Sequence, residues 1–308
     1  MKTFEEICRM SQKEVKSYMD EYLRDNKYNV INKEGFLYAK GDIPVLLVAH
    51  MDTVHHKQCK NIVVENGRMS SPEGIGGDDR CGIFIIMNIV NELRCSVLLC
   101  EDEEIGAVGA TKFIRSKYMS DVVANYIVEF DRRGNNDAVF YSCNNKKFTD
   151  FICDNTGFKE AYGSFSDISV LAPALKIAAV NLSSGYYKAH TTEEYVIYDE
   201  MLDVIDTAKA LIKVESEQFE YVKKTWSYNP HSYNQHDFFS DIPDYEAMPM
   251  HKLAANELDI ELEVVWYDSM CREKVGYATG RTKAEAWYDF FTNYIDVSFN
   301  MITDYNFT

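Results

Sequence analysis

One short segment constrains the fold of this chain more than any other. Residues 45–49, Val-Leu-Leu-Val-Ala, are apolar without interruption, and residues 96–100, Ser-Val-Leu-Leu-Cys, form a second buried strand in which only Ser96 is polar. A strand without alternating polar side chains is usually buried on both faces, in the middle of a sheet that helices cover. The two segments therefore predict a central sheet with helices on both sides.

Predicted helices and strands alternate around these two segments. Apolar residues at helical spacing predict helices at 4–24, 80–93, 108–117, 146–155 and 199–214. Short β-like runs predict strands at 28–31, 36–39, 125–130, 138–141 and 176–182. The pair Asn66-Gly67 predicts a hairpin between residues 62–65 and 68–70. This alternation is typical of an α/β domain.

The chain is long enough for more than one domain. We assign residues 1–215 to the α/β domain and residues 216–250, which are rich in Tyr, Asn, His, Asp and Pro, to a linker or long loop. Residues 251–308 are predicted to form a small β-β-α appendix of unknown role. Its predicted elements are strands at 258–267 and 274–279 and a helix at 282–294.

Charge and hydropathy argue against several classes of function. Acidic residues outnumber basic ones by 49 to 32, and the formal charge of −17 opposes the phosphate contacts of nucleic-acid binding. One alternative is that residues 274–294 imitate part of a double-stranded-RNA-binding domain, and the acidic surroundings of this segment oppose it. The first residues lack the apolar core of a signal peptide, and no segment is apolar enough to span a membrane, so a cytoplasmic location is expected. The 8 cysteines have no C-x-x-C spacing, which favours reduced core thiols.

Polar residues suited to metal binding follow the first buried strand. His50 and Asp52 come directly after residues 45–49, at the carboxyl end of a strand, where open α/β sheets place their ligand sites. Two positions apart, both side chains point the same way, so His50 could bind a metal while Asp52 holds its other ring nitrogen. The alternative is a hydrogen-bonded pair in a turn.

Two groups of carboxylates follow a glycine-rich turn and the second buried strand. Asp78 and Asp79 come just before a predicted helix, where one of them could cap the helix while the other bridges two cations. Glu103 and Glu104 end an acidic run after the strand, where one could bind metal and the other take a proton from water. A helix cap and a solvated acidic turn are the alternatives.

Asp131 and His190 complete the set. Asp131 follows the predicted strand at 125–130, and His190 lies in the run Gly-Tyr-Tyr-Lys-Ala-His-Thr-Thr-Glu-Glu. Nearly every member of the set closes a predicted strand of one sheet. Two imidazoles and three carboxylates form a nitrogen and oxygen ligand set that suits a pair of zinc ions, with cobalt or manganese as alternatives.

The order and local motifs of residues 40–200 resemble those of the co-catalytic dinuclear zinc peptidases of the M20, M28 and M42 families. His-Met-Asp-Thr-Val at 50–54 is similar to the first-ligand motif of peptidase T-like M20 enzymes, and Gly-Gly-Asp-Asp-Arg-Cys-Gly at 76–82 to the bridging-aspartate motif of all three families. Glu-Glu-Ile-Gly at 103–106 resembles their base-and-ligand pair, and His190 with Thr-Thr-Glu-Glu their final histidine motif. The resemblance implies a three-layer α/β/α mixed sheet of the zinc exopeptidase type, with the small C-terminal α+β appendix added.

The resemblance also implies five metal ligands. They are His50, Asp78, Glu104, Asp131 and His190. His50 and Asp131 would hold one zinc ion, Glu104 and His190 would hold the other, and Asp78 would bridge the two.

The spacing of the motifs departs from two of these families. Only 59 positions separate Asp131 from His190 (190 − 131), too few for the lid or dimerisation domain that M20 enzymes usually carry there. Only 28 positions separate His50 from Asp78 (78 − 50), so the insertion typical of M42 enzymes is missing as well. The compact layout resembles an M28-like single catalytic domain with M20-like motifs, and it leaves assembly into a homo-oligomer open.

The implied reaction is hydrolysis of amide bonds in short peptides, with Glu103 as general base and Asp52 orienting the first histidine. An aminopeptidase is the leading hypothesis. The nearest alternative is a deacylase or carboxypeptidase that uses the same metals, for example on an N-acyl small molecule, and a non-catalytic binding protein on this fold is a further one. Secondary candidates for substrate contact are His55, His56, residues 163–169, Tyr186 and Tyr187.

Overall fold

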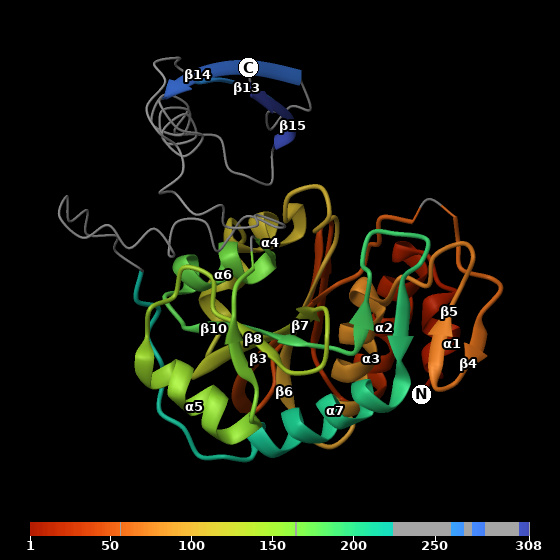
Figure 1. Ribbon diagram of the computed structural model, residues 1–308. Helices are drawn as coiled ribbons and strands as arrows, with labels where there is room; N and C mark the ends of the chain where they lie inside the picture. The colour runs from red at the N-terminus through yellow and green to blue at the C-terminus, as the bar shows by residue number, and fades with distance from the viewer. Residues whose placement is uncertain (56, 164, 224–259, 268–272, 281–301, 308) are drawn as a thin grey trace. The chain divides into compact units, whose positions relative to one another are not determined.

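The computed structural model describes residues 1–55, 57–163, 165–223, 260–267, 273–280 and 302–307 (Figure 1). The chain divides into two compact units, residues 1–232 and 233–308. In the first unit the described cysteines are free thiols, as the sequence predicts. Among the described residues, no helix has both the length and the apolar character that crossing a membrane requires.

The first unit is built on an eight-stranded mixed sheet with the order β1-β2-β6-β3-β7-β10-β8-β9 (Figure 1). The strands are β1 (Val30–Lys33), β2 (Phe36–Ala39), β3 (Ile43–His50), β6 (Cys95–Cys100), β7 (Tyr126–Arg132), β8 (Asp137–Val139), β9 (Lys159–Ala161) and β10 (Ala179–Ser183). The central strands β6, β3, β7 and β10 run parallel to one another. Their carboxyl ends therefore meet at one edge of the sheet.

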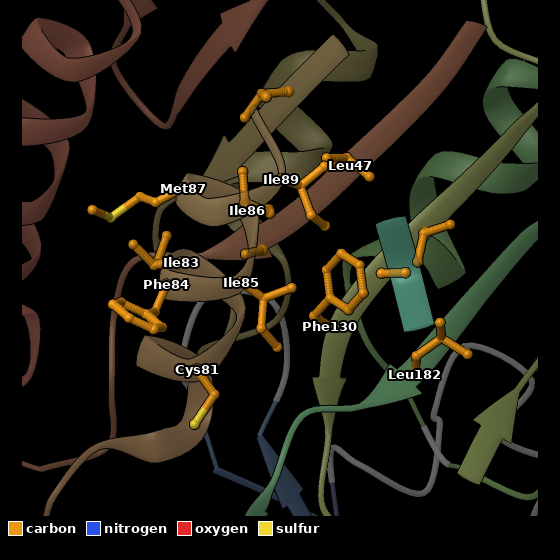
Figure 2. Close-up of a cluster of buried hydrophobic side chains, with 14 of the residues drawn as sticks. Leu47, Cys81, Ile83, Phe84, Ile85, Ile86, Met87, Ile89, Phe130 and Leu182 are labelled. Atoms are coloured by element: carbon orange, nitrogen blue, oxygen red, sulfur yellow. The ribbon is translucent and has the colours of Figure 1, made fainter. Parts of the chain in front are cut away.

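Helices cover both faces of this sheet, and each face has its own apolar core. One core includes residues of α1 (Phe4–Cys8), α2 (Gln12–Asp25), α3 (Gly77–Val90), α5 (Lys146–Thr156) and α7 (Tyr198–Ile212). The other includes residues of α4 (Val108–Ile114) and α6 (Asp167–Leu175). Strand β3 contributes Leu47 to the first core, which Figure 2 shows beside α3, and Leu46 to the second. The prediction of a strand buried on both faces is confirmed.

The predicted opening helix at 4–24 is wrong in one respect, because the structure has two helices there. Thr3 caps α1 and Ser11 caps α2, and each cap is paired with a glutamate three positions later, Glu6 and Glu14. A second capping box supplies partners for the first N–H groups of α2, so the chain can start a new helix after a short break.

A second, four-stranded sheet in the first unit has the order β11-β12-β5-β4. Its hairpin of β4 (Val63–Glu65) and β5 (Arg68–Ser70) confirms the prediction from Asn66-Gly67. Strands β11 (Tyr186–Tyr187) and β12 (Tyr195–Ile197) were not predicted. The loop between them carries His190.

The described part of the second unit is a three-stranded antiparallel sheet with the order β14-β13-β15. Its strands are β13 (Ile260–Tyr267), β14 (Glu273–Gly280) and β15 (Ile302–Phe307). The first two lie where strands were predicted, and the third was not predicted. The predicted helix at 282–294 lies outside the described residues, as does most of the predicted linker at 216–250.

Candidate metal centre

The carboxyl edge of the central sheet brings the predicted site residues together. His50 is the last residue of β3 and is completely buried, and Asp131 lies near the end of the neighbouring strand β7. Nε2 of His50 lies 3.6 Å from Oδ1 of Asp131 and 3.0 Å from Oδ1 of Asp78. Burial alone would lower the pKa of His50, but its contacts with these carboxylates and with Asp52 raise that pKa well above its usual value.

Asp78 lies between the two histidines of the set. Its Oδ1 is 3.0 Å from Nε2 of His50, and its Oδ2 is 3.2 Å from Nε2 of His190. Burial opposes ionisation, yet the contacts with His190 and His50 lower the pKa of Asp78 well below its usual value. Each carboxylate oxygen of Asp78 thus faces a different imidazole.

The adjacent Asp79 has a different role. Its Oδ1 accepts a hydrogen bond from the backbone N–H of Gly82 at 2.8 Å, which is the position of a capping carboxylate. Its Oδ2 accepts a longer hydrogen bond, 3.4 Å, from the backbone N–H of His50. One carboxylate of the pair therefore serves the start of α3, and the other faces the histidines.

Asp52 connects the first histidine to the acidic run. Its Oδ1 lies 3.2 Å from Nδ1 of His50 and also accepts the backbone N–H of Glu103 at 3.0 Å. Its Oδ2 accepts the backbone N–H of Glu104 at 3.1 Å. Although burial raises it, the pKa of Asp52 falls to about 2, because His50 and the two N–H groups favour the ionised form.

Glu103 and Glu104 face different surroundings. Oε2 of Glu104 lies 3.1 Å from Nε2 of His190. The other oxygen of Glu104, Oε1, is buried and accepts no hydrogen bond from the described residues. Burial raises the pKa of Glu103 to about 9, and the nearby carboxylates of Asp131 and Asp167 contribute to this rise. Glu103 is therefore a strongly basic carboxylate, suited to holding a proton near neutral pH.

Asp131 has partners that the sequence did not predict. Its backbone exchanges two hydrogen bonds with the side chain of Asn181 on β10, at 2.8 and 3.0 Å, and the hydroxyl of Tyr186 donates to its Oδ1 at 3.3 Å. Burial, followed by the charge of Asp78, raises the pKa of Asp131 to about 8. Tyr186, a secondary candidate for substrate contact, instead lies buried against this carboxylate.

His190 is the most exposed member of the set, with 57% of its side chain accessible. It lies in the loop between β11 and β12 and has a positive φ of 62°. Its contacts with Asp78 and Glu104 raise the pKa of His190 to about 11. The second sheet therefore delivers a solvent-accessible imidazole to an otherwise buried group of carboxylates.

The other secondary candidates lie as follows. Nε2 of His55 is 2.7 Å from the buried carboxylate of Glu194, the hydroxyl of Tyr187 donates to Glu200 at 2.6 Å, and Ser166 precedes α6 as its N-cap. His56 lies outside the described residues. The sequence did not single out Glu194, and its only signal was its place in the run after His190.

Several of these side chains could hold a metal ion. There are three candidate groups of His, Asp and Glu side chains among the described residues. Within each group, the possible ligand atoms all lie within 4.8 Å of one another. The groups are His50 with Asp79 and Asp131, His50 with Glu103 and Glu104, and Asp78 with Glu104 and His190. The buried Oε1 of Glu104 has no described hydrogen-bond donor, which is the condition of an oxygen available to a cation. The mixed nitrogen and oxygen donors suit zinc.

A cavity of about 370 Å³ adjoins this centre. It shares Asp52 with the centre, and its other walls include Thr53, His55, Gly76 and Arg80. The guanidinium of Arg80 is buried and donates to the carbonyl oxygens of Met51, Asp52 and Met10. Arg80 thereby ties the backbone after β3 to the start of α3.

Comparisons with known proteins give structural matches only. No family model matches the sequence, and no curated protein matches it. Among solved structures, the chain is similar to an aminopeptidase, PepT, from Bacillus cereus, with a TM-score of 0.57, 15% identity, and coverage of 68% of this chain and 96% of that chain. A tripeptidase from Staphylococcus aureus matches with a TM-score of 0.57, 14% identity, and coverage of 68% and 96%. An aminopeptidase from the archaeon Desulfurococcus kamchatkensis matches with a TM-score of 0.55, 14% identity, and coverage of 69% and 95%.

The first unit therefore has the fold of these peptidases, a mixed sheet of eight strands between two layers of helices. The likeness to zinc peptidases that the motifs predicted is confirmed at the level of the fold. Candidate groups of metal ligands lie at the carboxyl edge of the sheet within this fold.

Proposed function

We propose that this protein is a dizinc metallopeptidase that removes residues from the amino terminus of short peptides. The observation that carries the proposal is the position of Asp78, with one carboxylate oxygen 3.0 Å from His50 and the other 3.2 Å from His190. A carboxylate whose two oxygens face different imidazoles is suited to being shared by two cations, each of which one imidazole would also bind.

In this proposal the five ligands are the side chains that the resemblance of the motifs implies. His50 and Asp131 would hold one zinc ion, Glu104 and His190 would hold the other, and Asp78 would be shared between the two; cobalt or manganese could replace zinc. When bound, the cation pair supplies Lewis acidity, which polarises the scissile carbonyl and makes the attacking water more acidic.

The protein side chains then orient the reactants and move the proton. Asp52 holds the ring of His50 and, through two backbone N–H groups, the position of Glu103. Glu103 takes a proton from the attacking water and passes it to the nitrogen of the leaving amine.

Metal analysis combined with a substrate panel tests the proposal. We expect about two zinc ions per chain in the purified protein and loss of most of them in Asp78→Ala. Asp206→Ala, which removes an exposed aspartate from α7, is the matched control and should keep both. Failure of the wild-type protein to bind zinc, even after zinc is added, would overturn the proposal and favour a non-catalytic binding protein on this fold.

The substrate panel separates the proposed activity from its nearest alternative. Short peptides with a free amino terminus should be hydrolysed, and the same peptides with a blocked amino terminus should not. Preferential hydrolysis of the blocked or N-acylated compounds would instead show a deacylase or carboxypeptidase that uses the same metal centre.

A further inference from the structure

Glu194 is a buried carboxylate that the proposed mechanism does not use. Its side chain is completely buried, and it lies four positions after His190. Its Oε1 accepts a hydrogen bond from the backbone N–H of Asp78 at 3.0 Å, and its Oε2 accepts one from the backbone N–H of Gly76 at 2.9 Å. Nε2 of His55 lies 2.7 Å from the same Oε2. One carboxylate therefore satisfies three polar groups from two other segments.

Each segment that meets at Glu194 also supplies a proposed metal ligand. His55 lies five positions after His50, and the N–H groups of Gly76 and Asp78 belong to the turn that carries Asp78. Glu194 itself lies in the loop that carries His190. Glu194 is 116 positions from Asp78 and 139 positions from His55 in the sequence. The relative positions of these segments therefore depend on contacts such as those of Glu194.

We propose that Glu194 is a positioning residue that fixes the place of Asp78, the proposed bridging ligand, by holding its backbone against the His190 loop. This inference rests on the proposed function, because it assigns Asp78 to the bridge. Asp78 is then held twice by one loop, at its carboxylate by His190 and at its backbone N–H by Glu194.

The packing around this contact leaves little room for adjustment. An added Cβ at Gly77 would lie 2.7 Å from Cβ of Tyr186 and 3.3 Å from Oε1 of Glu194. The turn is therefore pressed directly against β11 and the carboxylate. If the two hydrogen bonds are lost, the N–H groups of Gly76 and Asp78 stay buried without acceptors, and the turn can regain partners only by moving.

A carboxylate is needed at position 194 because both of its oxygens must accept hydrogen bonds from backbone N–H groups. In Glu194→Gln the shape is kept, but the amide nitrogen is a donor. It would face the N–H of Asp78 in one orientation, and the N–H of Gly76 together with His55 in the other. A displacement of the turn moves both oxygens of Asp78, each of which must reach its own cation. Replacement of an outer partner of this kind typically costs about 10- to 100-fold in metal affinity.

The test is a zinc titration of the full-length chain, with visible spectroscopy of the cobalt-substituted protein as a second readout. We expect Glu194→Gln to bind zinc at least about tenfold more weakly than the wild type and to alter the cobalt absorption bands, which report the coordination geometry. Glu193→Gln is the matched control: its carboxylate is exposed and pairs with Lys188 at the surface, so both readouts should equal the wild type.

The outcomes separate this inference from the proposed function. If the wild type binds about two zinc ions and Glu194→Gln binds them with wild-type affinity and an unchanged cobalt spectrum, Glu194 is not a positioning residue, although the metal centre stands. If the wild type binds no zinc, the proposed function itself fails.

If Glu194→Gln does not fold, two variants of His55 test the same inference. His55→Ala removes one partner of Glu194, whereas His55→Gln keeps a side-chain N–H that can donate to the carboxylate. We expect weaker zinc binding in His55→Ala and its recovery in His55→Gln. Equal zinc affinity of the wild type and both variants would overturn the inference.

Discussion

The carboxylate of Asp52 accepts the backbone N–H of Glu104 at 3.1 Å, although the two residues are 52 positions apart and follow different strands of the sheet. The same carboxylate accepts the N–H of Glu103 and faces Nδ1 of His50. A side chain that binds no metal in our proposal thus fixes one ligand ring and the backbone of both functional glutamates.

Asp52→Asn is expected to weaken zinc binding and turnover by about 10- to 100-fold, because its amide nitrogen must face a backbone N–H or the histidine ring. Zinc titration and peptide hydrolysis measure the two effects. Asp42→Asn, at an aspartate that pairs with Arg94 and has 79% of its side chain exposed, is the control. Wild-type values in both assays for Asp52→Asn would contradict the role given to Asp52.

Glu103→Gln should separate catalysis from metal binding. We expect turnover to fall by about 10²- to 10⁴-fold, since glutamine cannot accept the proton, while the zinc content stays near two per chain. Steady-state kinetics and elemental analysis on the same preparation give both numbers. A fully active variant would exclude Glu103 as the general base.

The chelator-treated protein is expected to lose stability as the pH rises from about 5 to 9. The folded-state pKa values of Glu103 and Asp131, about 9 and about 8, lie above those of an unfolded chain. The folded state therefore binds more protons, so the stability from these groups is complete below about pH 4 and disappears as the pH passes through 8 and 9. The pKa of Asp52 is lowered to about 2, so Asp52 contributes to the stability of the folded state at neutral pH. This contribution is lost as the pH falls below about 4.

Thermal unfolding at a series of pH values, with and without added zinc, tests this expectation. Zinc should raise the Tm most at high pH, because the cations replace protons that the carboxylates otherwise hold. A Tm of the chelated protein that does not change between pH 5 and 9 would count against the pKa shifts of both carboxylates.

Leu47→Ala should destabilise the first unit by about 2 to 5 kcal/mol, because Leu47 is completely buried in the core between β3 and α3 (Figure 2) and its removal leaves a cavity. The same substitution at Leu202, which is 38% exposed on α7, should cost no more than about 1 kcal/mol. Unfolding in denaturant measures both, and equal losses at the two positions would be inconsistent with the packing described.

The sequence predicts the centre of this fold well because burial dominates there. Uninterrupted apolar runs define β3 and β6, and polar side chains directly after them mark the edge where ligands gather. Strands β11 and β12 are different: they have only two and three residues, and they exist through pairing with each other and of β12 with β5. A pattern of two or three residues is too short to predict the pairing of a strand with a distant one.

The same limit applies to side chains whose partners are distant. The motif after His190 includes Glu194, but its role depends on N–H groups more than 100 positions away. Asn181 holds Asp131 across neighbouring strands, and nothing in the run around Asn181 indicates this. The residue types of the candidate ligands could be read from local motifs, whereas the contacts that hold these residues depend on how distant segments meet in the folded chain.

The order of the sheet also governs how this chain can fold during synthesis. Strand β10 lies between β7 and β8, yet it is made after both of them. Until it emerges from the ribosome, β7 has one unpaired edge and the pair β8–β9 has no sheet to join, so the nascent chain exposes backbone groups that invite association with other chains. A ribosome-bound chain that stops before residue 179 should therefore remain sensitive to protease and depend on chaperones, and one that extends beyond α7 should become resistant in a single step.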